Sequence, residues 1–272
     1  MFFLICILIG FMAAFVGSIV GLGGGVILVP ILLILNEFLP SFDWASPQQI
    51  VGISVIVMIF TGLSSSYAYY KKDRIDFKSG LIFIIASVPG GIIGSWTNQF
   101  FDPDRFSIFL GILMLCMFLL FFFRRTSEPV LTEKRWQVNR TAKIHQKTYT
   151  YQFSIFAGFS VAFVVGMLSG MFGIGGGSLM VPIMVLVFRF PAHMATATSM
   201  FMILFTSISS SVTHIILGHV MWEYVWLFIP GAWFGGILGA KVNQQMKGST
   251  VEFLLRALLL IISIRLIWQG IE

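Results

Sequence analysis

The chain has 272 residues, of which 57% are hydrophobic and only 10% are charged. Its mean hydropathy of +0.94 exceeds what a water-soluble domain can carry, so the composition excludes a soluble enzyme or binding domain and predicts a protein embedded in a bilayer. The net charge of +6 could favour nucleic acid, but the basic residues lie in short loops, where they act as orientation signals. We expect a single integral membrane domain, residues 1–272, without a nucleic-acid partner.

The first apolar run, residues 2–36, is too long for one straight span, because about 20 helical residues cross the roughly 30 Å hydrocarbon layer. The motif GLGGGVILVP at 21–30 lies within this run. We expect one helix, a glycine turn, and a short second helix that begins near Val26 with Pro30 close to its first turn. Three ordinary spans are expected next, near residues 48–70, 79–99 and 105–123.

A polar stretch at 124–150 is predicted to be a connecting loop. The second half then follows the same order. A long apolar run at 151–189 contains GIGGGSLMVP at 173–182, and a short helix is expected to begin near Ser178. Three further candidate spans lie near 192–217, 222–243 and 249–270.

Two other segments recur in the same order in the second half. SVIVMIFTGLSSS at 54–66 matches SMFMILFTSISSS at 199–211, and GGIIGSWTNQ at 90–99 matches GGILGAKVNQ at 235–244. Apolar composition explains similar hydropathy but not matching register. The sequence therefore predicts two internal repeats, 1–123 and 151–272, in an all-α polytopic membrane protein with eight to ten segments.

The loop charges predict the orientation. Lys71, Lys72, Arg74 and Lys78, together with the basic loop 124–150, are expected to face the cytoplasm. In the second half, Arg189, Lys241 and Lys247 mark the loops whose counterparts are poor in Lys and Arg. This reversal predicts inverted repeats with five crossings each, ten in total, and both termini outside. Eight spans in parallel repeats remain the alternative.

The glycine breaks are candidate binding sites. A helix that begins inside the membrane presents free N–H groups and the positive end of its dipole, which bind anions without arginine. Glycine lets an anion approach those amides. The predicted binding residues are Gly21, Gly23, Gly24, Gly25, Gly173, Gly175, Gly176, Gly177 and Ser178. Close helix packing is the alternative explanation of the glycines.

Hydroxyl side chains recur at helical spacing after each break and predict a lined path. They are Ser54 and Thr61 in the first half and Thr198, Ser199 and Thr206 in the second. Capping of backbone carbonyls is the alternative role for these groups. No Asp, Glu or Lys lies at the centre of a predicted span, which argues against a buried carboxylate proton carrier. His214 is a possible substitute or a structural residue.

Catalytic, cofactor and metal signatures are absent from the sequence. It contains no HExxH, GxSxG or P-loop motif, and Cys6 and Cys116 lack metal-ligand spacing. We expect no enzymatic activity, no catalytic residues, no cofactor and no metal. The two cysteines are expected to be packing residues.

The duplicated Gly-x-Gly-Gly-Gly-x-x-x-x-Pro motif and ATATSM at 195–200 resemble the sulfite exporter TauE/SafE family, also called the toluene-sulfonate uptake permeases. The resemblance covers nearly the whole chain. It implies a multi-pass permease of a bacterial-type cytoplasmic membrane that transports small, often sulfur-containing anions such as sulfite, sulfonates or sulfoacetate. Family members are described with seven to nine spans, so ten departs from that pattern. GIS at 52–54 stands where the second half has ATS.

The sequence thus predicts a membrane permease for a small anion, with export as the direction that the resemblance implies. An anion channel is one alternative. A membrane scaffold or assembly factor that transports nothing is another. The sequence does not specify the anion or the oligomeric state.

Overall fold

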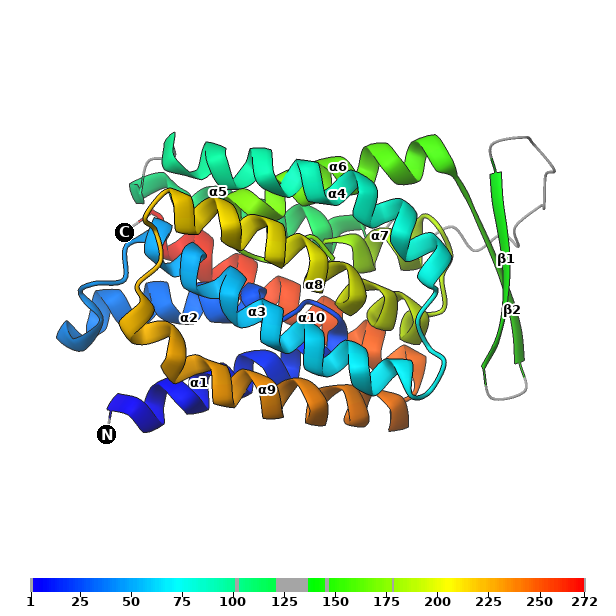
Figure 1. Cartoon of the computed structure of the whole chain (residues 1–272), viewed down its shortest axis with the longest axis horizontal. Helices are drawn as coiled ribbons and strands as arrows, with labels where there is room; N and C mark the ends of the chain where they lie inside the picture. Colours follow the sequence, from blue (N-terminus) through cyan, green and yellow to red (C-terminus); the bar gives the residue numbers. More distant parts are fainter. Residues whose placement is uncertain (1, 101–102, 121–136, 145–146, 178, 272) are drawn as a thin grey trace.

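The computed structural model describes residues 2–100, 103–120, 137–144, 147–177 and 179–271. These residues form an elongated helical bundle with a small hairpin at one end (Figure 1). The α-helices are α1 (Phe2–Val20), α2 (Gly25–Phe38), α3 (Pro47–Tyr70), α4 (Phe77–Thr97), α5 (Pro103–Leu119), α6 (Ile155–Phe172), α7 (Met180–Leu186), α8 (Ala192–Ile216), α9 (Trp222–Gln245) and α10 (Gly248–Gln269). Two 3₁₀ turns, η1 (Pro40–Phe42) and η2 (Asn98–Phe100), follow α2 and α4.

The protein is an all-α membrane protein. Within the described residues, six helices are long and apolar enough to cross a bilayer, namely α1, α3, α4, α6, α8 and α9. The helices α2 and α5 are shorter apolar segments. The eight to ten predicted segments therefore correspond to ten helices, of which six meet the length and apolarity of a full span.

Both long apolar runs break at their glycines. The helix α1 ends at Val20 and α2 begins at Gly25, while α6 ends at Phe172 and α7 begins at Met180. The sequence placed the second starts near Val26 and Ser178; Ser178 itself lies outside the described residues. Pro182 is the third residue of α7, in the first turn, where a missing proline N–H costs least. Pro30 lies inside α2, beyond its first turn.

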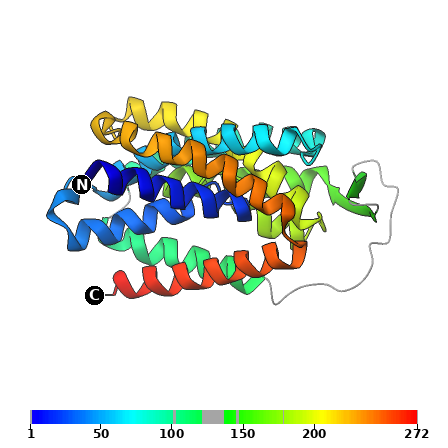
Figure 2. The same ribbon diagram turned by 90° about the horizontal axis from the view of Figure 1, so that it is seen from below.

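The main helix contacts join the first half of the chain to the second. The helix α1 packs along α9, α4 along α6, α3 along α8 and α5 along α10; the α1–α9 pair lies side by side in both Figure 1 and Figure 2. Glycines allow the close approach. A Cβ atom on Gly10 of α1 would lie only 2.6 Å from the carbonyl oxygen of Phe228 on α9, as is typical of small-residue interfaces in membranes.

The predicted connecting loop 124–150 is wrong in its second part, where the chain forms an antiparallel hairpin. The strand β1 (Gln137–Ile144) pairs with β2 (Lys147–Ser154), with Arg140 opposite Tyr151. The hairpin extends into the first residues of the predicted second repeat, so α6 begins at Ile155. Alternating Thr and Tyr residues in KTYTYQFS favour a strand, but the high charge of the region suggested a loop. Residues 124–136, also predicted as loop, lie outside the described part.

The hairpin is anchored on the bundle by buried side chains of β2. The Tyr151 hydroxyl donates a 2.7 Å hydrogen bond to Oδ2 of Asp76, the residue that caps the N-terminus of α4. The ring of Tyr151 lies 4.1 Å from that of Phe190, between centroids. Burial and the hydrogen bond to Asp76 raise the pKa of Tyr151 well above its ordinary value, so its hydroxyl remains a donor at physiological pH.

Both termini lie at one end of the bundle and the hairpin lies at the other (Figures 1 and 2). The α3–α4, α7–α8 and α9–α10 loops lie at the hairpin end (Figure 1). These loops and the last turn of α9 carry the basic residues Lys71, Lys72, Arg74, Arg189, Lys241 and Lys247. These six basic residues, which come from both halves, thus lie at the same end of the molecule.

The close approach of α1 and α9 predicts the effect of a small substitution. Gly10→Ala places a methyl group against the backbone of α9 and should lower the free energy of unfolding by about 1–3 kcal/mol, the usual cost of overpacking. The melting temperature of the purified protein in detergent measures this loss. Gly248→Ala is the matched control, because its nearest heavy atom would lie 3.9 Å away. Equal melting temperatures for the two variants would contradict the packing.

Candidate functional site at the paired helix breaks

The backbone of each break adopts a conformation that favours glycine. Gly24, the N-cap of α2, has φ of 87°, and Gly173, the C-cap of α6, has φ of 69°. Gly21, Gly23 and Gly175 also have positive φ angles. Residues other than glycine rarely adopt this left-handed backbone conformation, so the turns themselves require most of these glycines.

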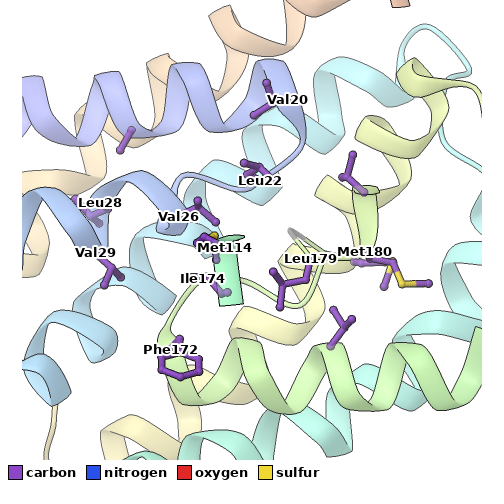
Figure 3. Close-up of a cluster of buried hydrophobic side chains, with 14 of the residues drawn as sticks. Val20, Leu22, Val26, Leu28, Val29, Met114, Phe172, Ile174, Leu179 and Met180 are labelled. Atoms are coloured by element: carbon purple, nitrogen blue, oxygen red, sulfur yellow. The ribbon is translucent and has the colours of Figure 1, made fainter. Parts of the chain in front are cut away.

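The two breaks contact each other in the centre of the bundle. A Cβ atom on Gly25 would lie 2.5 Å from the carbonyl oxygen of Gly173 and 2.6 Å from Sδ of Met58. Leu22 and Val26 of the first break share a cluster of buried side chains with Ile174 and Leu179 of the second (Figure 3). The structure therefore brings together the two glycine motifs that the sequence singled out.

Each break accepts a hydrogen bond from a buried serine on a helix of the other half, α3 or α8. Oγ of Ser54, on α3, donates a 2.7 Å hydrogen bond to the carbonyl of Gly173. Oγ of Ser199, on α8, lies 2.5 Å from the carbonyl oxygen of Gly21 and 2.8 Å from that of Gly177. Both side chains are fully buried. Their hydroxyls satisfy carbonyls that the broken helices leave without intrahelical partners.

Two asparagines repeat this arrangement two residues earlier in the chain. Nδ2 of Asn98 donates a 2.7 Å hydrogen bond to the carbonyl of Met171 in the last turn of α6. Nδ2 of Asn243 donates one of 2.5 Å to the carbonyl of Ile19 in the last turn of α1. Each asparagine thus caps a helix of the other half, rather than its own.

Backbone N–H groups are free at the first break. Among the described residues, Leu22, Ile27 and Leu28 donate hydrogen bonds to backbone carbonyls of this segment, whereas the N–H groups of Gly23–Val26 have no acceptor. Free amides at the start of a helix, together with its dipole, attract an anion. At the second break, Met180 donates to the Gly177 carbonyl, and Ser178, a predicted binding residue, lies outside the described part.

Electrostatic attraction at this site comes from the backbone. The fully buried polar side chains of the described residues are Ser, Thr, Asn and His, with no Asp, Glu, Lys or Arg among them. A charged side chain is costly at this depth, whereas a helix start supplies partial positive charge without that cost. The breaks are therefore suited to an anion and lack a charged partner for a cation.

The three remaining predicted hydroxyls, on Thr61, Thr206 and Thr198, do not bond across the breaks. Thr61 Oγ1 donates to the carbonyl of Val57 at 3.1 Å, and Thr206 Oγ1 to that of Met202 at 3.0 Å, each within its own helix. Thr206 still borders the second break, since a Cβ atom on Gly176 would lie 2.9 Å from its Oγ1. Thr198 lies apart, where its Oγ1 accepts a 3.1 Å hydrogen bond from the Asp76 N–H.

Three residues at the breaks were missed by the sequence-based prediction. Ile203 packs on Gly23 and Gly175, and Met58 packs on Gly25 and Gly175. They lie four residues after Ser199 and Ser54, which places them on the same helix face, so this spacing was an available signal. Thr196, whose Cα would lie 2.8 Å from a Cβ on Gly21, is fully buried and its Oγ1 has no partner among the described residues.

Comparison with known proteins shows the family of the chain. The family model described as sulfite exporter TauE/SafE matches residues 6–266. The chain belongs to this family. A probable membrane transporter, YunE of Bacillus subtilis, is 44% identical over 271 residues, covering 100% of this chain and 99% of the relative. A probable membrane transporter of Methanocaldococcus jannaschii is 24% identical, covering 93% of this chain and 91% of the relative. No solved structure matches the chain.

Membership of the TauE/SafE family makes the chain a multi-pass membrane transporter rather than an enzyme. The chain and these relatives match over nearly their full lengths. Both halves of this TauE/SafE protein, including the two breaks, therefore lie within the shared region.

The crossing serines predict a similar loss of stability at the two breaks. Ser199→Ala leaves the Gly21 carbonyl without a donor and Ser54→Ala leaves the Gly173 carbonyl without one, at roughly 1–3 kcal/mol per group. We expect the melting temperature to fall by a similar amount for both variants. Ser66→Ala is the matched control, because the buried Ser66 hydroxyl has no partner among the described residues. A Ser66→Ala loss as large as that of Ser199→Ala would contradict this assignment.

Proposed function

We propose that the protein is a carrier of a small anion, which binds between the paired helix breaks through backbone N–H groups. The observation that carries the proposal is the set of free amides at Gly23–Val26 in the centre of the bundle, with no buried Asp, Glu, Lys or Arg side chain in the described residues. We infer the transport function from family membership and the anionic nature of the ligand from the backbone groups at the breaks. The proposed binding residues are those predicted from the sequence except Thr198, whose hydroxyl lies apart from the breaks, with Thr196 added.

The two halves are proposed to be inverted repeats, residues 1–123 and 151–272. Gly21 corresponds to Gly173 at an offset of 152 residues, and Ser54 to Ser199 at an offset of 145. The crossing bonds support this relation because each has a counterpart, Ser54 to Gly173 and Ser199 to Gly21. The opposite entry of α1 and α6 into the bundle also supports it (Figure 1).

The proposed membrane is the cytoplasmic membrane, with the hairpin end in the cytoplasm and both termini outside. The support is the gathering of basic loops at the hairpin end (Figure 1), since Lys and Arg favour the cytoplasmic side. Backbone amides select an anion by charge and size. The family description names sulfite export, so sulfite and small sulfonates are the proposed substrates and export is the proposed direction.

Movement of the anion requires the breaks to loosen from their neighbours. Met58 and Ile203 are in close contact with the glycines of both motifs. Because Ser54 holds the second break and Ser199 holds the first, a shift of α3 against α8 acts on both breaks together. We propose that this shift exposes the bound anion to one side of the membrane at a time.

The first test is flux into proteoliposomes that contain the purified protein. Uptake of radiolabelled sulfite should be saturable and should be inhibited by small sulfonates. Unsaturable conductance would identify a channel instead of a carrier. The absence of flux and of any anion-dependent change in melting temperature would favour a scaffold and overturn the proposal.

A paired substitution tests whether the backbone itself binds the anion. Gly176→Ala places a Cβ atom 2.8 Å from Cγ2 of Thr206 and should reduce flux at least tenfold, about 1.4 kcal/mol or more of lost stabilisation. Thr206→Ala removes both that methyl group and the Oγ1 atom 2.9 Å away, so the double variant should regain stability but not flux. Full recovery of flux in the double variant would show that access to the amides is not required.

Labelling of introduced cysteines tests the orientation. In a Cys6→Ala, Cys116→Ser background, Glu223→Cys lies at the start of α9 and Thr141→Cys on β1, both exposed positions. A membrane-impermeant maleimide should label Glu223→Cys in intact cells and Thr141→Cys only after permeabilisation. The reverse pattern would place the hairpin outside the cell.

A further inference from the structure

Two histidines meet at the end of α8 opposite the hairpin. Nδ1 of His214, in the last turns of α8, lies 3.0 Å from Nδ1 of His219 in the α8–α9 loop. Nε2 of His214 lies 3.3 Å from the carbonyl oxygen of Gly170 on α6. The His214 side chain is fully buried, whereas His219 is partly exposed. The proposed transport function assigns no role to this pair.

The contacts determine where the protons lie. A carbonyl oxygen accepts, so Nε2 of His214 carries a hydrogen and Nδ1 of neutral His214 accepts one from Nδ1 of His219. One added proton leaves both contacts intact, because the two Nδ1 atoms still share a single hydrogen. A second proton would place two N–H groups against each other. The geometry therefore accepts one proton and disfavours two.

The end of α6 presents partial negative charge to the His214–His219 pair. The Gly170 carbonyl belongs to the last turn of α6, whose C-terminal end carries the negative end of the helix dipole. It also accepts a 3.4 Å hydrogen bond from Oγ of Ser95 on α4. Three residues after Gly170, Gly173 begins the second break. A proton on this pair thus acts on the end of α6 that leads directly into the proposed binding site.

The groups that face the pair from three neighbouring helices do not titrate near neutral pH. They are the Gly170 carbonyl on α6, the Ser95 hydroxyl on α4, and Gly52 on α3, which packs against the His219 backbone. From α9, the acidic Glu223 lies in the first turn and is exposed to solvent. Burial lowers the pKa of His219, so His219 is neutral at neutral pH and gains a proton as the pH falls.

The first half makes the equivalent contact with a residue that does not titrate near neutral pH. Tyr69, which precedes His214 by the same offset of 145 residues that relates Ser54 to Ser199, donates a 2.8 Å hydrogen bond from its hydroxyl to the carbonyl of Ser18 in α1. A tyrosine hydroxyl holds its proton throughout the physiological range. The proton-dependent contact is therefore specific to the second break.

We infer that the His214–His219 pair is a proton-binding site on the external side of the protein, which links proton binding to anion binding at the second break. This inference rests on the proposed anion transport. A proton held at the end of α6 adds positive charge beside the break, so the anion should bind more tightly when the external pH falls. By reciprocity, the bound anion should hold the proton more tightly.

The test uses methanesulfonate, a monoanion whose own charge is constant across the range of about pH 5 to 8 in which histidine titrates. Binding to the purified protein and flux in proteoliposomes are measured across this range. The wild-type affinity should rise roughly five- to tenfold on acidification, within the usual range of coupling between sites. His214→Gln keeps an N–H donor for Gly170 without titrating, and His214→Tyr reproduces the contact of Tyr69; both should abolish the pH dependence.

His193→Gln is the matched control. His193 is a histidine of the same helix that contacts Asn243 at the opposite end, and its substitution should leave the pH dependence unchanged. His219→Asn should weaken the dependence, because it removes the partner that shares the proton. A wild-type pH profile in His214→Gln, with normal binding, would overturn the inference while leaving the proposed function intact.

A second measurement separates the two proposals. Nitrogen-15 spectra of histidine-labelled protein report protonation directly, and the signals of the His214–His219 pair should titrate together with one proton, with a midpoint that shifts in His219→Asn. Absence of any titration of the pair between about pH 5 and 8 would overturn the proton site even if transport occurs. Titration without binding or flux of any anion would instead overturn the proposed function and, with it, the link between the two sites.

Discussion

A broken helix in a bilayer must find partners for its backbone within the protein, because each unsatisfied amide or carbonyl group in hydrocarbon costs several kcal/mol. The architecture around the two breaks follows from this constraint. Carbonyls that lose their intrahelical partners receive hydrogen bonds from Ser54, Ser199, Asn98 and Asn243. All four donors come from helices of the other half, so the breaks can be buried only when the two halves are packed together.

The same constraint is the reason to propose that the free amides of Gly23–Val26 bind a ligand. The carbonyls of Gly21, Gly173 and Gly177 accept hydrogen bonds, whereas these N–H groups have no acceptor among the described residues. An anion supplies the missing acceptors and the matching charge. The absence of Asp, Glu, Lys and Arg from the buried polar groups of the described part leaves the backbone as the source of attraction.

The helix breaks were predictable from the sequence because a run of glycines in an apolar segment acts locally. The positive φ of Gly24 and Gly173 is the conformation for which glycine is needed. The crossing contacts were not predictable, since the spacing of Ser54 and Ser199 along their helices indicates a face but not the carbonyl that it meets. Thr61 illustrates the difference, because its hydroxyl bonds its own helix.

The hairpin was missed for a different reason. Its strands lie in a basic, polar region, where composition favours a loop. Their packing on the bundle comes from contacts of Tyr151 and Phe153 with aromatic residues far along the chain. Strand propensity depends on such packing more than on local sequence. The histidine pair was equally inaccessible, because the spacing of His214 and His219 does not indicate that Gly170 lies beside them.

The central claim is that backbone amides at the breaks bind the anion. It is tested most directly by the amide signals of glycine-labelled protein in nitrogen-15 spectra, recorded while methanesulfonate is added. We expect saturable shifts at Gly23, Gly24 and Gly25 at the concentration that half-saturates transport, with little change at Gly10 or Gly248. Saturable transport without any change at the glycines of the two breaks would place the anion elsewhere and contradict the account.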